Sequence, residues 1–388
     1  MGALDRLPPW STTGVGSLPY SDGRTAVARA VGDYDLPFCP QLPRLEGDMV
    51  AEWLGADPCR CGWSPDRGRE RPRAWELLLR ELMLAPPAHD VVKLQVTGPL
   101  TLAVALERGA GRGPVDAALR REVATWLAAN VAGQVAALRE RGFDTLVMVD
   151  EPALHAVAGI PGIERSWDPL RALGAPWGLH LCCAVPWDVV DRADPDVLSF
   201  DLVPAPVDRR GATALRGLLR RGGRVAWGAL PVHREDPSPV VTGRLAAAVG
   251  RCGADGAQSL LTASCGTGRQ APRREAHIAR ALTELACRRR ALDGVRLDHA
   301  ASRVPATPGR LLGVPPPSRR DSLSARNRRA TYPRIGGRLP ADAGRSLPSR
   351  YPTVWSNLRG AGSARCPTCA LGVDLRLCTQ IGKLRSQG

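Results

Sequence analysis

Short apolar runs alternate with longer stretches of helical periodicity from the first residues to about residue 290. Short apolar runs bounded by turn residues are typical of buried strands, and apolar residues three or four positions apart are typical of helices. In the segment 115–141, for example, Val123, Leu127, Val131 and Val135 share one helical face. The pattern predicts eight strands, at 12–15, 36–39, 91–97, 145–149, 177–182, 197–200, 224–228 and 259–262, and further helices at 186–192, 212–221, 239–249 and 272–290.

This alternation of strands and helices favours parallel βαβ units. Eight such units within about 290 residues predict an α/β fold of the (β/α)8 TIM-barrel type, with catalytic residues at the carboxyl ends of the strands. A doubly wound open sheet is the structural alternative. No G-x-G-x-x-G motif follows a strand, so a dinucleotide-binding version of that sheet is not supported.

The pattern changes after residue 295. Residues 296–388 are rich in Arg, Pro, Ser and Gly and lose hydrophobic periodicity, which predicts a disordered tail beside a barrel of residues 1–295. This tail contains Cys366, Cys369 and Cys378, but a lone CxxC without a second pair is only a weak zinc signal.

Net charge is concentrated in that tail. The chain has 53 Lys and Arg against 38 Asp and Glu, and residues 296–388 hold 17 and 4 of these, so residues 1–295 hold 36 and 34. A nearly neutral body makes nucleic acid an unlikely partner. The first ten residues have no apolar h-region, and no run of 18 apolar residues occurs, so we expect a cytoplasmic protein with no membrane partner.

Metal-binding residue types stand at the ends of three predicted strands. His180 and Cys182 end the fifth strand, Asp201 ends the sixth, and Cys265 follows the eighth. Residues two apart on a strand point to the same side. An imidazole, two thiolates and one further N or O ligand suit tetrahedral Zn²⁺. The plain alternative is three unrelated core residues, because free Cys is among the most buried residue types.

Several ordered motifs resemble the cobalamin-independent methionine synthase family, in particular its C-terminal zinc-bearing barrel and its short stand-alone relatives. The resemblance covers residues 11–290 and rests on Thr12-Thr13-Gly14-Val15-Gly16-Ser17-Leu18-Pro19, Pro40-Gln41-Leu42-Pro43, Gly47-Asp48-Met49-Val50, Gln95-Val96-Thr97-Gly98-Pro99, Val149-Asp150-Glu151-Pro152-Ala153-Leu154, His180-x-Cys182, Ser199-Phe200-Asp201 and Ala263-Ser264-Cys265-Gly266.

The resemblance implies an S-methyltransferase that moves a methyl group to a small thiol, with homocysteine as the expected acceptor and methionine as the product. It places zinc on His180, Cys182, Asp201 and Cys265, with Asp201 standing where the full-length enzymes usually have Glu. The remaining site residues are expected to hold the amino-acid substrate: Val15, Gly16 and Ser17 through backbone and hydroxyl groups, and Asp150 through the substrate ammonium.

Two departures bear on the substrates. The segment Pro40-Gln41-Leu42-Pro43 has no carboxylate where the family has a Glu that helps to bind the amino acid. The half of the full-length enzymes that helps to bind folate polyglutamate is absent, so the donor is expected to be a methylcorrinoid, free or on a carrier protein, or another activated methyl compound, with folate as the alternative. His155 and His233 are the candidate proton donors to a folate nitrogen.

Two other functions remain open from the sequence. One is a metal-free barrel enzyme resembling uroporphyrinogen decarboxylase, which would have no use for the thiols. The other is a nucleic-acid-binding protein that acts through its basic tail.

Overall fold

The computed structural model describes residues 2–55, 63–65, 72–109 and 115–294. Within these ranges, seven parallel strands form one curled sheet in the order β1-β7-β6-β5-β4-β3-β2. The strands are β1 (Ser11–Thr12), β2 (Val91–Thr97), β3 (Asp144–Asp150), β4 (Trp177–Leu181), β5 (Val197–Asp201), β6 (Arg224–Leu230) and β7 (Ser259–Ala263). From β2 to β7 each strand pairs with the next one along the chain, as βαβ units require. The α/β fold and its parallel sheet are confirmed.

The expected strand at 36–39 is the exception. It forms no regular strand, and only an isolated bridge links Phe38 to Lys93 of β2. The Leu36 N–H nevertheless donates to the Thr12 carbonyl of β1, and the Cys39 N–H donates to the Lys93 carbonyl of β2. Pro37 has no N–H to add to a ladder, which limits regular pairing. The segment therefore lies between the two edge strands of the curled sheet, as a TIM-barrel-like fold requires, although the prediction of eight strands is wrong for the described residues.

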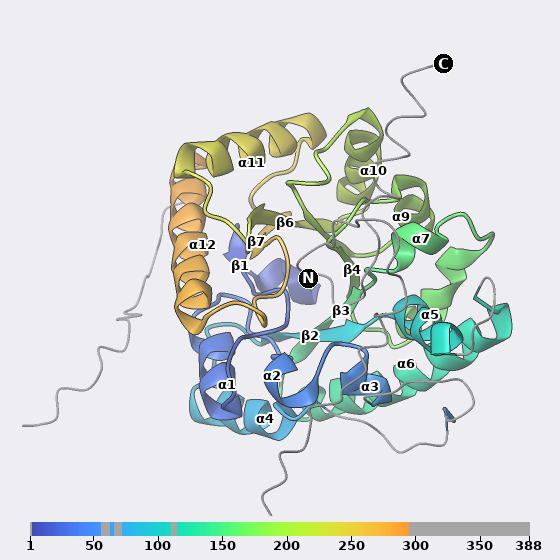
Figure 1. Cartoon of the computed structure of the whole chain (residues 1–388). Coiled ribbons are helices and arrows are strands. Elements are labelled where there is room, and N and C mark those ends of the chain that lie inside the picture. The colour runs from blue at the N-terminus through green and yellow to red at the C-terminus, as the bar shows by residue number, and fades with distance from the viewer. Residues whose placement is uncertain (1, 56–62, 66–71, 110–114, 295–388) are drawn as a thin grey trace, which may run out of the picture. The chain divides into compact units, whose positions relative to one another are not determined.

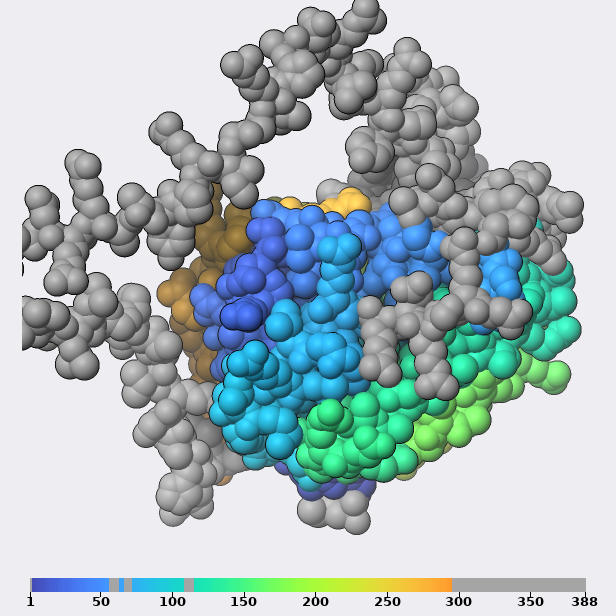
Figure 2. Space-filling view, turned by 90° about the horizontal axis from the view of Figure 1, so that it is seen from below, coloured from blue at the N-terminus to red at the C-terminus, as the bar shows by residue number. Residues whose placement is uncertain are grey.

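Helices surround the strands (Figure 1). They are α1 (Gly23–Gly32), α2 (Pro43–Glu46), α3 (Ala51–Leu54), α4 (Trp75–Leu84), α5 (Pro99–Gly109), α6 (Ala117–Arg139), α7 (Leu154–Val157), α8 (Asp168–Arg171), α9 (Trp187–Ala193), α10 (Arg209–Arg220), α11 (Ser238–Cys252) and α12 (Pro272–Leu292), with short 3₁₀ helices η1 (Ala3–Arg6) and η3 (Ile163–Trp167). The five helices expected from periodicity are confirmed. Figure 2 shows one helical face, on which the blue-to-cyan N-terminal third meets the green middle of the chain.

Aspartate side chains begin three of these helices. Asp22, Asp116 and Asp208 each accept a hydrogen bond from a backbone N–H in the first turn of α1, α6 and α10. Such caps satisfy N–H groups that have no partner inside the helix, and each is worth about 1 kcal/mol. Local sequence therefore fixes where these helices begin, and with them the ends of the loops that precede them.

The core has two parts. The larger cluster lies between the sheet and its helices. The smaller one lies on the concave face of the sheet, where Leu4 and Leu7, on and just after η1, pack against Val91, Leu146 and Val197. These three strand residues stand at or near the amino ends of their strands. The N-terminal segment therefore closes one end of the curled sheet and leaves the opposite end for chemistry.

The expected tail, with Cys366, Cys369 and Cys378, lies outside the described residues, as do Cys59 and Cys61. Among the helices that the structure describes, none is long and apolar enough to cross a membrane.

Candidate metal centre and substrate pocket

One row of register partners brings three polar side chains together on the concave face. Asp150 of β3 pairs with His180 of β4, and His180 pairs with Ser199 of β5. All three are buried. Because inward and outward positions alternate along a strand, the inward residues nearer the amino ends are the apolar ones of the smaller core. The polar row therefore lies above an apolar floor.

The His180 ring is held in one orientation. It is 3 % exposed, and its Nδ1 lies 2.9 Å from the Ser199 hydroxyl oxygen. Its Nε2 is buried and makes no hydrogen bond to the described part of the chain. In zinc sites, a second group usually forms a hydrogen bond to one ring nitrogen of the ligating histidine and so orients the other nitrogen toward the metal. Ser199 stands in that relation to His180, whose Nε2 is left without a hydrogen-bond partner among the described residues.

Two cysteines face that nitrogen. Ligand atoms of His180, Cys182 and Cys265 all lie within 4.8 Å of one another. Cys182 directly follows β4, whereas Cys265 follows β7, three strands away in the sheet, so the curl of the sheet brings them together. Contact with Cys182 lowers the pKa of Cys265 well below its ordinary value, and the His180 ring lowers it further, although burial opposes both. One nitrogen and two sulfur donors at this separation fit Zn²⁺, which prefers imidazole and thiolate ligands.

Asp201 is not part of this group. Its carboxylate ends β5 and accepts a hydrogen bond of 2.8 Å from the Val203 N–H. Burial raises its pKa to about 7, and the negative charge of Cys265 adds to the rise. Its role as a fourth ligand stays a prediction.

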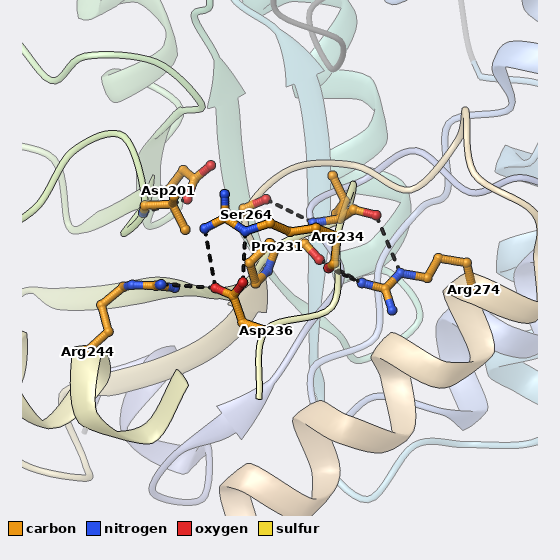
Figure 3. A network of polar contacts seen from close by, with 9 residues as sticks. Asp201, Pro231, Arg234, Asp236, Arg244, Ser264 and Arg274 are labelled. Atoms are coloured by element: carbon orange, nitrogen blue, oxygen red, sulfur yellow. Dashed lines mark hydrogen bonds and ion pairs between the residues drawn. The ribbon is translucent and has the colours of Figure 1, made fainter. Parts of the chain in front are cut away.

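A clamped loop stands beside Asp201 (Figure 3). The residues after β6 are held by Arg274 of α12, which donates to the carbonyls of Pro231 and Arg234 and pairs with Glu235. Asp236, in the same loop, pairs with Arg234 at 2.7 Å.

Asp236 also pairs with Arg244 of α11, at 2.9 Å. These contacts fix the loop that carries His233 to the rim of the pocket.

The segment Val15-Gly16-Ser17 is tightly packed, and its Val15 and Ser17 line the same pocket as the metal ligands. A Cβ atom added at Gly16 would lie 2.6 Å from Gln95 Cγ, so no larger residue fits there. The Ser17 carbonyl accepts from the Thr267 N–H at 2.9 Å, which joins this segment to the loop after β7. The expected substrate-binding backbone is therefore rigid and is packed against the loop that carries Cys265.

Asp150 is 5 % exposed and accepts a hydrogen bond of 2.6 Å from Gln95 Nε2. Burial raises its pKa to about 6, while the nearby His180 opposes that rise. Asp150 and Ser17 line the same pocket as His180, Cys182 and Cys265. The structure thus brings the expected ammonium-binding carboxylate and the metal group into one site.

The pocket also contains carboxylates that sequence reasoning missed. Glu46 and Glu52 line it, and each has one buried oxygen without a hydrogen-bond partner among the described residues. Gln41 donates to the other oxygen of Glu52 at 2.8 Å. Burial raises the pKa of Glu52 well above its ordinary value, and the charge of Glu46 raises it further. The Pro40–Pro43 stretch supplies no carboxylate, but Glu52 of α3 brings one to the same pocket.

The two histidines considered as proton donors differ in position. His233 lines the pocket, and burial lowers its pKa, so a smaller fraction of it carries a second proton at neutral pH. His155 is absent from the pocket lining, and its Nδ1 lies 2.9 Å from the Pro152 carbonyl oxygen. Neither arrangement supports proton donation to a leaving nitrogen.

No family model and no curated protein matches this chain. Among solved structures, a B12-independent methionine synthase from a Shewanella species, in complex with selenomethionine, has a TM-score of 0.52 at 15% identity and covers 74% of this chain and 99% of that one. A structure from Listeria monocytogenes described as a vitamin-B12-independent methionine synthase has a TM-score of 0.40 at 14% identity, covering 56% and 70%. A methylaspartate ammonia lyase from Clostridium tetanomorphum has 0.40 at 12%, covering 74% and 61%. The first of these likenesses shows a shared fold.

Proposed function

We propose that this chain is a zinc-dependent methyltransferase that transfers a methyl group to the thiol of homocysteine and yields methionine. The observation that carries the proposal is the group of His180, Cys182 and Cys265, whose ligand atoms lie within 4.8 Å of one another in the pocket that Asp150 and Ser17 also line. The fold shared with a methionine synthase in complex with selenomethionine supports it. A site with one polar end for an amino acid and one sulfur-rich end suits an amino acid that bears a thiol.

When bound, zinc would supply the Lewis acidity that keeps a substrate thiol deprotonated at neutral pH, although a free thiol has a pKa of about 8.5. His180, Cys182 and Cys265 would hold the metal, and Ser199 orients His180 through Nδ1. Coordination through Nε2 requires that atom to carry no proton, so Nδ1 would donate its hydrogen to the Ser199 hydroxyl.

Other residues of the pocket would bind the amino-acid part of the substrate. Asp150 and Glu52 would offer carboxylate oxygens to an ammonium group, and the backbone of the Val15-Gly16-Ser17 segment, of which Val15 and Ser17 line the pocket, would offer N–H groups to a carboxylate. A buried carboxylate without a partner is costly, and a substrate ammonium removes that cost. Glu52 thus supports homocysteine as the acceptor, against the doubt that the sequence raised.

In the reaction, the substrate sulfur forms a bond to the methyl carbon, and the bond from that carbon to the donor breaks with its electron pair leaving on the donor. His180, Cys182 and Cys265 would hold the metal to which the sulfur binds, and the donor would supply the leaving group. His155 and His233 do not support a protonated leaving nitrogen. A methylcorrinoid, free or carried by a partner protein, is therefore the donor that we propose, with folate as the alternative.

The test begins with zinc content. We expect about one zinc per purified chain, as three protein ligands and an open position imply. Cys182→Ser and Cys265→Ser should each remove it. Cys287→Ser, which changes an exposed cysteine of α12, is the matched control and should retain the metal.

Methyl transfer is then measured with homocysteine and, separately, a methylcorrinoid, folate monoglutamate and folate polyglutamate. Stoichiometric zinc in the double cysteine variant would refute the metal site. Zinc loading without methionine from any donor would refute the activity, and turnover with folate but not with methylcorrinoid would reverse the proposed donor.

A further inference from the structure

Lys93 is buried on the concave face, beneath the pocket. It stands on β2, is 2 % exposed, and lies 5.0 Å from the centre of the Phe38 ring. A buried ammonium is costly unless its donors are satisfied. Lys93 Nζ donates to the Val15 carbonyl at 2.8 Å and to Gln95 Oε1 at 2.5 Å. Its hydrogen bonds therefore reach both the Val15-Gly16-Ser17 segment and the side chain that contacts Asp150.

The first of these contacts sets the direction of a chain of hydrogen bonds. Burial lowers the pKa of Lys93 to about 7, although the charge of Asp150 opposes that fall. As an ammonium Lys93 can only donate, and an ionised Asp150 can only accept. Gln95, placed between them, must turn its oxygen to Lys93 and its NH₂ group to Asp150, as the distances of 2.5 and 2.6 Å show. Without the ammonium, the Gln95 amide is free to rotate and present its oxygen to the carboxylate. Lys93 thus fixes the hydrogen bond that holds Asp150.

The second contact acts on the backbone. In a trans peptide the N–H points opposite to the C=O. Because the Val15 carbonyl points to Lys93, below the pocket, the Gly16 N–H of the same peptide points the other way. A Cβ atom added at Gly16 would lie 2.6 Å from Gln95 Cγ, so the Gln95 side chain lies close to this peptide and leaves little free space beside it. The same ammonium thus sets the orientation of a backbone donor on one side and of a carboxylate on the other.

We infer that Lys93, acting with Gln95, is a positioning residue that holds both halves of an amino-acid-binding site, the N–H donor for the α-carboxylate and the Asp150 acceptor for the α-ammonium. It touches neither substrate nor metal. The inference rests on the proposed function, because it names what the site binds.

The experiment compares kinetic constants of the zinc-loaded full chain. Lys93→Met removes the ammonium and keeps the length of the side chain. We expect its KM for homocysteine to rise about tenfold or more, because interactions with the substrate are lost in the ground state as well as in the transition state. Zinc content and the KM for the methyl donor should stay within about twofold of the wild type. Arg120→Met is the matched control, because it removes another buried cation, from α6, outside the pocket, and should change neither KM.

Gln95→Glu provides a second variant of nearly equal size. It keeps an acceptor for Lys93 but puts an oxygen where Gln95 donates to Asp150, so the KM for homocysteine should rise as in Lys93→Met. If Lys93→Met fails to fold, the KM of Gln95→Glu for homocysteine tests the inference in its place.

An unchanged KM for homocysteine in a folded, zinc-loaded variant would overturn the inference, as would a parallel loss of zinc, donor binding and homocysteine binding. If the wild type itself forms no methionine, the proposed function is refuted. If the wild type is active and the variants keep its KM for homocysteine, only the role of Lys93 is refuted.

Discussion

The two ends of the concave face are built from the same strands but differ in every property that matters for function. At the amino ends, Val91, Leu146 and Val197 pack against Leu4 and Leu7. At the carboxyl ends, the side chains are those of the metal group and the substrate pocket. At the amino ends, a substitution that keeps the volume of an apolar side chain should preserve the structure. At the carboxyl ends, function requires particular atoms at particular distances. In barrel folds generally, the amino-terminal face serves stability and the carboxyl-terminal face serves chemistry.

The largest effect on stability is expected at the amino-terminal end. Leu146→Ala removes a fully buried side chain from the smaller cluster, where it packs with Leu4 and Leu7. Loss of buried area together with the cavity left behind should lower the free energy of unfolding by about 2–5 kcal/mol. Zinc content of the folded variant should not change. Chemical denaturation with metal analysis checks both, and loss of zinc from the folded protein would show that the two ends are coupled.

The next effect belongs to the carboxyl-terminal end. Ser199→Ala removes the partner of His180 Nδ1 while hardly changing volume. Zinc affinity should fall by about 10–100-fold, as for other groups that orient a ligating histidine. Stability without metal should change little. A competition titration with a chelator of known affinity measures the first quantity. Equal zinc affinity in the two proteins would mean that packing alone orients the ring.

Much of this contrast is visible in the sequence. The strand positions follow from apolar runs, and the metal group follows from the strand ends. Lys93, Gln95 and Thr97 are polar residues at alternate positions of one strand, and this alternation indicates the concave face. The strand prediction made no use of this signal, because apolar residues stand between them. Pro37 gave the reason why 36–39 is not a regular strand.

Other parts were beyond the sequence. Glu52 reaches the pocket from α3, a helix of four residues whose placement depends on the fold of the whole segment between β1 and β2. No periodicity in so short a helix indicates which way its side chains face. The separation of Asp201 from the three ligand atoms likewise depends on the path of the chain after β5, where the Val203 N–H holds its carboxylate.

A smaller effect concerns pH. Glu151 is 1 % exposed and accepts hydrogen bonds from Thr101, Trp167 and the Leu100 N–H. Burial raises its pKa from 4.5 to about 7. A raised pKa in the folded state means that its contribution to stability is complete below about pH 4.5 and is lost as the pH rises through about 7.

The wild type should therefore lose about 2–3 kcal/mol relative to Glu151→Gln between pH 5 and pH 8, because the neutral variant has no such dependence. Any constant cost of the substitution cancels in this difference. Denaturation of both proteins at the two pH values measures it. If the free energy of unfolding of the wild type instead rises relative to that of the variant as the pH rises, the hydrogen bonds to Glu151 affect its pKa more than burial does.

The smallest effect is expected from shortening the chain to residues 1–295. Trp10 Nε1 donates to Asp293 at 2.5 Å, and Arg290 Nε donates to the Pro9 carbonyl at 2.7 Å, so the residues before β1 are joined to the end of α12. Arg290 also pairs with Asp35, which follows α1, at 2.9 Å. These contacts are complete by residue 293, and most of the net positive charge of the chain lies beyond it, because residues 296–388 hold 17 Lys and Arg against 4 Asp and Glu. The shortened chain should unfold within about 2 °C of the full chain and hold as much zinc, since it keeps every contact named here and all three metal-binding residues. Trp10→Phe in the shortened chain should then cost about 1 kcal/mol for the lost hydrogen bond. A shortened chain that unfolds far earlier, or that loses zinc, would mean that residues 296–388 support the barrel, and the assignment of stability to the amino-terminal end would have to include them.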